Sequence, residues 1–552
     1  MVNPVNTALE RASWQKHLFG ERLSRLQLLK FQADWPLIQT AVRLHRNHGF
    51  ELVASVTPPW FAWWGRDVRY VFSDYDDSLS FDFADEESFD LEIVWLDLQP
   101  YEERLEQATL ADWLGERLAA LRGMTESPIL VVAIGQTGAF HDQLMARIGD
   151  LAGVRLADIR PLVGFLGDRL FDDRAAKFSG TRLSDEACLS IARELTCRWA
   201  ASMLCPRIKA IAVDLDQTLY EGVLGEDGHD VQLTGGHASL HKFLLEMRSE
   251  GVFLALVSRN EMEDVQQLFA ARKDFPLRLE HFDVTCVSWG SKTEALRQTA
   301  RELRIGEDAL LFVDDNAGEL AAVASELPAC PLLHVTEDPS LTLRVLEYYP
   351  RLWAWEASPS DGLRIADMQA EQQRGRLLQG SPDPHDYLRS LRVRITIEVT
   401  PTQQRKRMWE LSQKTNQFNL NLSRFSEAAI SRMLNSTNHR LVTISLKDRL
   451  SDSGLIGLVI GRQNEQTLEI LELAISCRAL GRRLEDLMID ESVQAILREL
   501  PCNKVDFFQT AGPRNGPARQ WLTHYRDMDL PTRERLPVEV EVIATNRPDN
   551  AI

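Results

Sequence analysis

The chain has 552 residues, of which 44% are hydrophobic, and its 81 acidic against 62 basic side chains give a formal net charge of −19. This length predicts several domains, and the negative charge excludes general nucleic-acid binding, which requires clustered Lys and Arg. The chain has no long apolar run and no signal-peptide pattern, and its seven scattered cysteines form no CxxC pair, so we expect a cytoplasmic protein with reduced thiols and no membrane association.

The first 205 residues alternate short apolar segments with amphipathic ones, a rhythm that predicts a doubly wound α/β domain. The expected strands are residues 25–31, 50–56, 91–98 and 129–134, and the expected helices include residues 35–47 and 110–121. Trp60, Trp63 and Trp64 cluster near two prolines. This cluster can be interpreted either as core packing under a loop or as an interaction surface.

A second α/β domain is predicted over residues 206–355. An expected helix at 185–203 ends before Cys205-Pro206, and the proline marks the boundary. Expected strands at 210–214, 253–258 and 309–314 all end in polar residues. Because open parallel sheets bind ligands at the carboxyl edge of their strands, these polar residues are the first site candidates.

After about Pro339 the pattern changes to Leu- and Trp-rich helical segments, followed by a polar stretch and a loop, and we predict a helical linker over residues 356–391. Residues 392–552 then combine alternating segments at 393–399, 440–447 and 455–461 with helical ones. We expect a third domain of the α+β class.

Two carboxylates, Asp214 and Asp216, directly follow the expected strand at 210–214. Side chains two residues apart in an extended segment point the same way. Such a pair can divide its work: Asp214 attacks phosphorus, and Asp216 protonates the leaving group and later deprotonates water. Two neighbouring carboxylates also favour Mg²⁺, a hard cation that prefers oxygen ligands.

Further residues in the same hundred-residue stretch supply the other needs of phosphoryl transfer. Ser258 can donate its hydroxyl to a phosphate oxygen, and Lys292 can hold the aspartate and phosphate charges together. Asp315 is the expected third magnesium ligand, beside Asp214 and the backbone carbonyl of Asp216, with Glu319 as an auxiliary. The remaining substrate-binding candidates here are Thr218, Arg259, Asn260 and Asp314.

This ordered set resembles the haloacid dehalogenase (HAD) superfamily, and the flanking residues resemble its FkbH-like branch, subfamily IIIC. The segments that carry the likeness are DLDQTLYEGVLGEDG at 214–228, LVSRN at 256–260, LFVDDN at 311–316, KTNQFNL at 414–420 and SCRALGR at 476–482. The resemblance implies a multidomain α/β protein: a flavodoxin-like or SGNH-hydrolase-like domain at 1–205, a Rossmann-like HAD domain at 206–355 and a GNAT-like acyltransferase domain at 392–552.

The resemblance also implies an activity and a partner. FkbH-like proteins dephosphorylate 1,3-bisphosphoglycerate, a phosphorylated three-carbon substrate, and pass the glyceryl group through a protein cysteine to an acyl carrier protein for polyketide-type biosynthesis. Two alternatives stay open: a HAD phosphatase fused to an N-acyltransferase that acts on a small molecule such as an amino sugar, and a noncatalytic scaffold that docks carrier proteins.

Candidates in the third domain follow from the same likeness. Cys477 is either the relay nucleophile or a small core residue, and Cys205 and Cys286 are the other relay candidates. The segment with Arg478, Gly481 and Arg482 is interpreted as a loop that binds the phosphate of a pantetheine arm. The alternative is that it is an ordinary basic first turn of a helix. Asn416 is a weaker pocket candidate. In the first domain no Gly-Asp-Ser follows the expected first strand, so we predict that this domain is noncatalytic.

Overall fold

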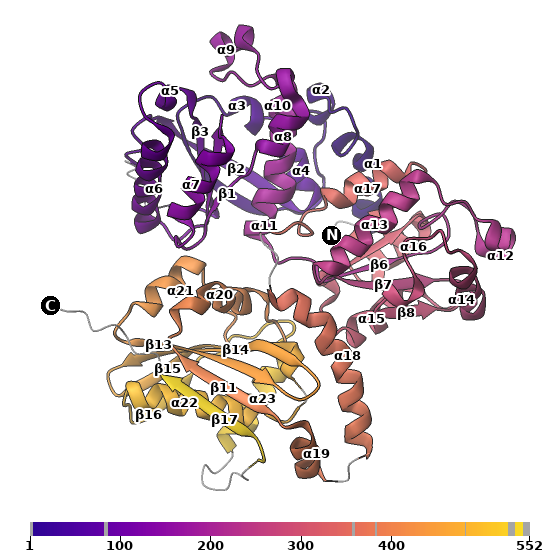
Figure 1. Ribbon diagram of the computed structural model, residues 1–552, viewed down its shortest axis with the longest axis vertical. Helices are drawn as coiled ribbons and strands as arrows, with labels where there is room; N and C mark the ends of the chain where they lie inside the picture. Colours follow the sequence, from indigo (N-terminus) through magenta and orange to yellow (C-terminus); the bar gives the residue numbers. More distant parts are fainter. Residues whose placement is uncertain are drawn as a thin grey trace. The chain divides into compact units, whose positions relative to one another are not determined.

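The computed structural model describes residues 4–81, 87–355, 359–380, 383–480, 482–527 and 536–544. They divide into two compact units, Met1–Ala357 and Ser358–Ile552, whose elements are labelled in Figure 1. In the described part of the chain, no helix combines the length and the apolar character needed to cross a membrane.

The first unit begins with a five-stranded parallel sheet in the order β2-β1-β3-β4-β5. Its strands are β1 (Ile38–Arg46), β2 (Arg66–Tyr75), β3 (Leu91–Asp97), β4 (Ile129–Ile134) and β5 (Val154–Leu156). One face packs on α4 (Pro58–Trp63) and α10 (Asp185–Glu194), and the other on α6 (Gln107–Met124) and α7 (Gly138–Ile148). The predicted doubly wound layer is therefore confirmed.

Three predictions at the start of this layer are wrong. The expected strands at 25–31 and 50–56 are the short helices α2 (Arg25–Leu28) and α3 (Glu51–Ala54), and the expected helix at 35–47 is strand β1. Strand β1 lies between β2 and β3, so even its polar residues Arg43 and His45 are buried, beside Glu92. Pairing on both edges outweighs the helix-like spacing of its apolar residues.

The second sheet of this unit is also parallel, in the order β10-β9-β6-β7-β8. Its strands are β6 (Ala210–Val213), β7 (Phe253–Ser258), β8 (Val284–Val287), β9 (Leu310–Asp314) and β10 (Leu332–His334), as predicted for β6, β7 and β9. Its helices are α13 (Gly235–Ser249), α14 (Met262–Ala271), α15 (Lys292–Glu302), α16 (Ala317–Glu326) and α17 (Pro339–Glu347). One continuous apolar core joins this sheet to the first.

Helix α1 (Pro4–Leu18) connects the two layers of the first unit, because it packs on α16 of the second layer and on α4 of the first. The side-chain amide of Gln15 takes both backbone groups of His334: its Nε2 donates to the carbonyl, at 2.9 Å, and its Oε1 accepts from the N–H, at 3.2 Å. His334 ends the edge strand β10. The first helix is thus bonded directly to the second sheet.

The second unit contains a mixed seven-stranded sheet, in which β12, β15, β14, β13, β11 and β17 lie side by side and β16 pairs with β15. The strands are β11 (Arg394–Val399), β12 (Phe418–Asn419), β13 (His439–Lys447), β14 (Asp452–Asn464), β15 (Thr467–Ile475), β16 (Lys504–Phe507) and β17 (Glu539–Ala544). Helix α22 (Glu485–Glu499) covers one face, and α20 (Arg405–Lys414) with α21 (Glu427–Leu434) the other. The predicted α+β class is confirmed.

The described parts of the expected helical linker, residues 356–391, are helices α18 (Pro359–Gly380) and α19 (Pro384–Leu391), which belong to the second unit. A buried ionic network fixes α18 to the sheet. The guanidinium of Arg374 donates to Asp448, at 2.8 Å, and to Asp367, at 3.3 Å. Arg482 donates to the same two carboxylates, at 3.2 and 3.3 Å. All four side chains are at most 3% exposed.

Candidate functional site

The polar residues expected at the edge of the second sheet do meet there. Asp214 follows β6, Ser258 ends β7, Asp314 ends β9, and Lys292 begins helix α15. Because all five strands are parallel, their carboxyl ends lie on one edge of the sheet. All four side chains are buried, so the site is a polar cluster at the end of an apolar sheet.

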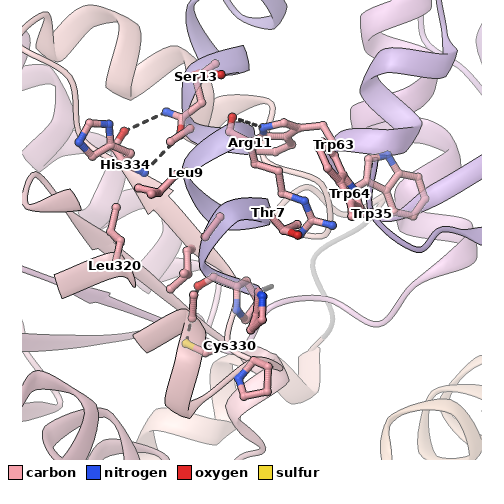
Figure 2. Close-up of a pocket in the computed structure, with 18 of the residues that line it drawn as sticks. Thr7, Leu9, Arg11, Ser13, Trp35, Trp63, Trp64, Leu320, Cys330 and His334 are labelled. Carbon is pink, nitrogen blue, oxygen red and sulfur yellow. Dashed lines mark hydrogen bonds between the residues drawn. The ribbon is translucent and has the colours of Figure 1, made fainter. Parts of the chain in front are cut away.

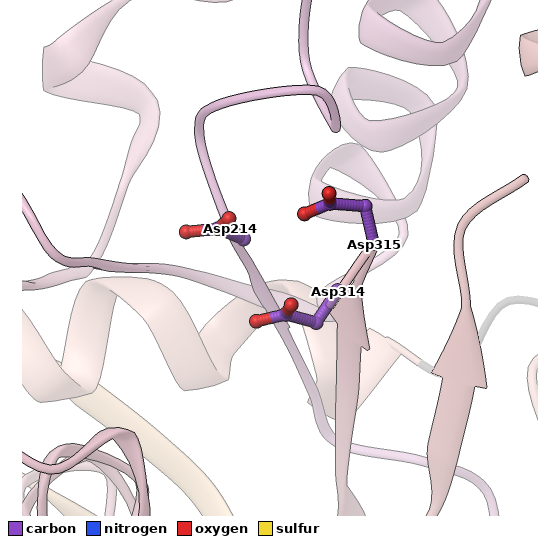
Figure 3. A group of neighbouring side chains, drawn as sticks. All are labelled: Asp214, Asp314 and Asp315. Atoms are coloured by element: carbon purple, nitrogen blue, oxygen red, sulfur yellow. The ribbon is translucent and has the colours of Figure 1, made fainter. Parts of the chain in front are cut away.

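Lys292 is the centre of this group. Its Nζ lies 2.9 Å from Asp214 Oδ1 and 2.7 Å from Asp314 Oδ2. Asp315 completes a cluster in which one carboxylate oxygen from each aspartate lies within 4.8 Å of the others, and Figure 3 shows the three side chains together. Three carboxylates and one ammonium carry two net negative charges, which is the charge that one divalent cation would neutralise.

The electrostatics of the cluster reflect this imbalance. Burial raises the pKa of Asp214, and Lys292 offsets the shift only in part. Burial also raises the pKa of Asp314 and of Asp315, to which Asp214 adds repulsion. For Lys292, burial opposes the charge, but the attraction of Asp214 and Asp314 is larger and raises its pKa. The ammonium therefore stays charged, and the carboxylates need a second cation to stay ionised together.

The carboxylate of Asp216 is held apart from this cluster. Its Oδ1 accepts from the hydroxyl of Tyr220, at 2.6 Å, and from the N–H of Leu224, at 2.8 Å, while Oδ2 accepts from Asn260, at 2.8 Å. These bonds fix its orientation, as a proton-transfer group requires. Sequence reasoning missed Tyr220, because only the turn at 217–224 brings its hydroxyl back to Asp216.

The remaining candidates of this domain divide into two kinds. The amide of Asn260 also donates to Ser258 Oγ, at 3.0 Å, so the hydroxyl hydrogen of Ser258 is left for another acceptor. The buried Oγ1 of Thr218 has no hydrogen-bond partner within the described chain. Arg259, by contrast, pairs with Glu319 at 2.9 Å, so the residue expected as an auxiliary magnesium ligand is instead the partner of an arginine.

His334 contacts the backbone of Asp315. Its Nε2 lies 2.9 Å from the backbone carbonyl of Asp315, so this nitrogen carries the proton and donates it. Since Gln15 binds the backbone of His334, a series of hydrogen bonds connects helix α1 to Asp315. Neither residue was singled out from the sequence, because their pairing joins positions more than three hundred residues apart.

The structure gives the expected phosphate-binding loop of the second unit a different role. Arg482 is 3% exposed, and its two terminal nitrogens donate to Asp367, Asp448 and Ser453 and to the carbonyl of Arg478, while its buried Nε has no partner among the described residues. The first turn of α22 carries Glu485 and Asp486, whose charges oppose a bound phosphate. Gly481 lies outside the described residues. The contacts of Arg482 indicate a structural role, and phosphate binding by this loop stays a prediction.

The other candidates outside the phosphoryl site are dispersed. Cys477 is half-buried and begins the short 3-10 segment Cys477–Ala479, and Asn416 accepts a hydrogen bond from Arg424. Burial raises the pKa of the Cys286 thiol, and Cys205 lies 3.5 Å from a guanidinium nitrogen of Arg66.

The noncatalytic interpretation of the first layer relied on a segment that is not a strand. The true first strand, β1, is followed by Asn47, His48 and Gly49, and this position also lacks a serine. His48 is buried and stacks on Trp95, with ring centroids 5.0 Å apart, and burial lowers its pKa to about 4. We interpret His48, neutral and packed, as a structural residue. That the first layer is noncatalytic stays a prediction.

No protein-family model matches the chain, and no curated protein matches it. Among solved structures, the N-terminal part of the protein BF1531 from Bacteroides fragilis, which contains a phosphatase domain complexed with Mg, is 18% identical over 60% of this chain and 100% of that chain, with a TM-score of 0.48. A fungal multi-domain GH3 β-N-acetylglucosaminidase with a GCN5-related glucosamine N-acetyltransferase region is 11% identical over 96% of this chain and 68% of that chain, with a TM-score of 0.14. Since both TM-scores are below 0.5, the function is argued from the site itself.

Proposed function

We propose that the first unit is a magnesium-dependent phosphohydrolase of the HAD type, with Asp214 as its nucleophile. The observation that carries the proposal is the pairing of one ammonium, Lys292, with three clustered aspartates at the carboxyl edge of a parallel sheet. Asp214, Asp315 and the backbone carbonyl of Asp216 would hold the Mg²⁺. When bound, it would neutralise charge on the phosphoryl group and on the carboxylates.

The reaction then follows from the residues. Asp214 attacks phosphorus, the bond from phosphorus to the leaving oxygen breaks, and Asp216 supplies a proton to that oxygen where one is needed. Lys292 and the hydroxyl of Ser258 stabilise the phosphoryl oxygens. In the second half-reaction, Asp216 takes a proton from water, the resulting hydroxide attacks phosphorus, and phosphate leaves as the carboxylate of Asp214 is restored.

We further propose an acyl phosphate, such as 1,3-bisphosphoglycerate, as the substrate and an acyl carrier protein as the acceptor of its acyl group. For transfer, a protein thiol attacks the acyl carbon, the bond from that carbon to the phosphate oxygen breaks and phosphate leaves, because attack at phosphorus would release a free carboxylate that cannot acylate a thiol. This part is supported by the FkbH-like segments, which occur in both units. Phosphate binding by Arg482 is no longer part of the proposal. The second unit contributes the half-buried thiol of Cys477 as the relay candidate.

Magnesium affinity is expected to depend steeply on pH. Burial raises the pKa of Asp214 to about 7, and that of Asp315 is raised as well, so below neutral pH a proton occupies a ligand that the metal needs in ionised form. We expect the apparent Kd for Mg²⁺ to be on the order of tenfold weaker at pH 6 than at pH 8, because one proton is displaced per metal. Magnesium titrations of phosphate release at the two pH values measure this. Equal affinities would contradict the raised pKa values.

Removal of the second unit should separate phosphate release from carrier loading. A chain of residues 1–357 contains the whole phosphoryl site and is one compact unit, so we expect it to hydrolyse an acyl phosphate at the rate of the full chain. We expect it to load no acyl group onto a holo carrier protein, as measured by intact-protein mass spectrometry.

Cys477→Ala in the full chain tests the relay, with Cys502→Ala as the matched control. Loading by residues 1–357 alone would move the relay to Cys205 or Cys286. Loss of phosphate release together with loading would argue against independent roles for the two units. Phosphate release without any adduct on the carrier would favour a simple phosphatase.

A further inference from the structure

A cavity of about 950 Å³ lies beside helix α1 in the first unit. Its walls come from α1, from the start of α16, from the segment that precedes β10, and from residues 349–351 after α17. Figure 2 shows Trp35, Trp63 and Trp64 on one side of α1 and Leu320, Cys330 and His334 on the other. Asp214, Ser258 and Lys292 do not line it, although His334, which contacts the carbonyl of Asp315, belongs to both the cavity wall and the surroundings of the phosphoryl site.

The charge of the lining is opposite to that of the protein. The described lining residues include Arg11 and Arg351 but neither Asp nor Glu, in a chain whose net charge is −19. Arg351 is satisfied, because its guanidinium donates to the carbonyls of Pro206 and Asp308, at 2.7 and 2.9 Å. Within the described chain, Arg11 forms no ion pair, and its buried Nε has no hydrogen-bond partner.

Arg11 is half-buried, and withdrawing its Nε from water without a hydrogen-bond acceptor is costly, because nothing replaces the lost water. Burial accordingly lowers the pKa of Arg11. A second donor on the same lining, the indole N–H of Trp64, is also buried without a hydrogen-bond partner in the described residues. Both donors line the same cavity, so a ligand bound there can supply the acceptors that the described part of the protein does not.

The remaining lining residues indicate the chemical character of the rest of the ligand. Trp35, Trp63, Trp64 and Tyr349 contribute aromatic surface, and the guanidinium of Arg11 lies 5.3 Å from the ring centre of Trp35. Small-molecule sites commonly combine such apolar walls with a few placed polar groups. We propose that this cavity binds a small organic anion that has a planar, apolar body, with Arg11 as the residue that recognises its charge.

Calorimetric titration of the full chain with 1-naphthoate tests the proposal, and 1-naphthamide is the matched neutral probe. We expect saturable binding of naphthoate and about tenfold or weaker binding of the amide, because only the carboxylate forms a charge-assisted hydrogen bond with Arg11. This comparison uses the unaltered protein and no catalytic readout, so its result is independent of the proposed phosphohydrolase activity.

A pair of variants locates the binding. Arg11→Met keeps the apolar length of the side chain, and we expect it to weaken naphthoate about tenfold while the weak affinity for the amide stays the same. Arg104→Met removes an exposed arginine outside the cavity and should change neither. Three results would each overturn the proposal: no saturable naphthoate binding at millimolar concentrations, equal affinity for acid and amide, or naphthoate affinity that is unaltered by Arg11→Met.

Discussion

Asp214→Asn is expected to lower phosphate release from an acyl phosphate by about 10³-fold or more while the protein stays folded. The amide has nearly the shape of the carboxylate but cannot form a phosphoaspartate, so the first bond to phosphorus is not made. The fold is expected to persist, because Lys292 keeps its 2.7 Å ion pair with Asp314. Release of phosphate measured at saturating Mg²⁺, with thermal unfolding of the same samples, gives both quantities.

The matched control for this change is Asp264→Asn, which removes an exposed carboxylate from the first turn of α14 and should leave the rate unaltered. Intact mass of the unaltered enzyme, quenched in acid during turnover, should show a phosphoryl adduct that Asp214→Asn lacks. Phosphate release at the full rate by Asp214→Asn would refute Asp214 as the nucleophile, whatever the substrate.

Arg482→Met is expected to destabilise the second unit by roughly 3 kcal/mol or more, because it leaves Asp367 and Asp448 buried with only Arg374 between them. For a unit of this size, that change lowers the melting temperature by roughly 10 °C. Differential scanning calorimetry of the full chain should show a lowered transition for this unit, while phosphate release by the first unit stays the same.

The neighbouring exposed residue provides the comparison. Arg483→Met removes the same charge from the same loop but breaks no described ion pair, so we expect a change in stability of less than about 0.5 kcal/mol. If Arg482 bound a pantetheine phosphate, Arg482→Met would weaken carrier loading without lowering the melting temperature. A stable Arg482→Met variant with impaired loading would therefore restore the interpretation drawn from the sequence.

The phosphoryl site could be anticipated from the sequence because its parts follow apolar strands of the central sheet. A buried parallel strand is a nearly continuous apolar run, so its end, and hence the carboxyl edge, is visible in the sequence. Asp214, Ser258 and Asp314 were placed on that basis. Tyr220, the partner of Asp216, and His334, the partner of Asp315, could not be predicted. A turn brings Tyr220 to the site, and the neighbouring strand β10 brings His334.

The failures elsewhere have similar physical causes. Strand β1 contains Arg43 and His45, which are buried only because Glu92 on the adjacent strand pairs with them. A single sequence does not reveal that compensation, and the segment resembled an amphipathic helix. Arg482 shows the opposite case: its loop looks basic and exposed in the sequence, while the carboxylates that pair with it lie 34 and 115 positions away.

The bonds between Gln15 and His334 have a consequence for where the smallest working phosphatase begins. The side-chain amide of Gln15 offers one donor and one acceptor, as a peptide group would, and so extends the sheet past its edge strand β10. His334 in turn holds the carbonyl of Asp315. A fragment that starts at residue 206 would keep every expected catalytic residue. It would nevertheless lack Gln15, so the edge of β10 would be exposed and the backbone of His334, which contacts Asp315, would lose its support. The minimal catalytic fragment should therefore begin at helix α1, far upstream of the domain that contains the chemistry.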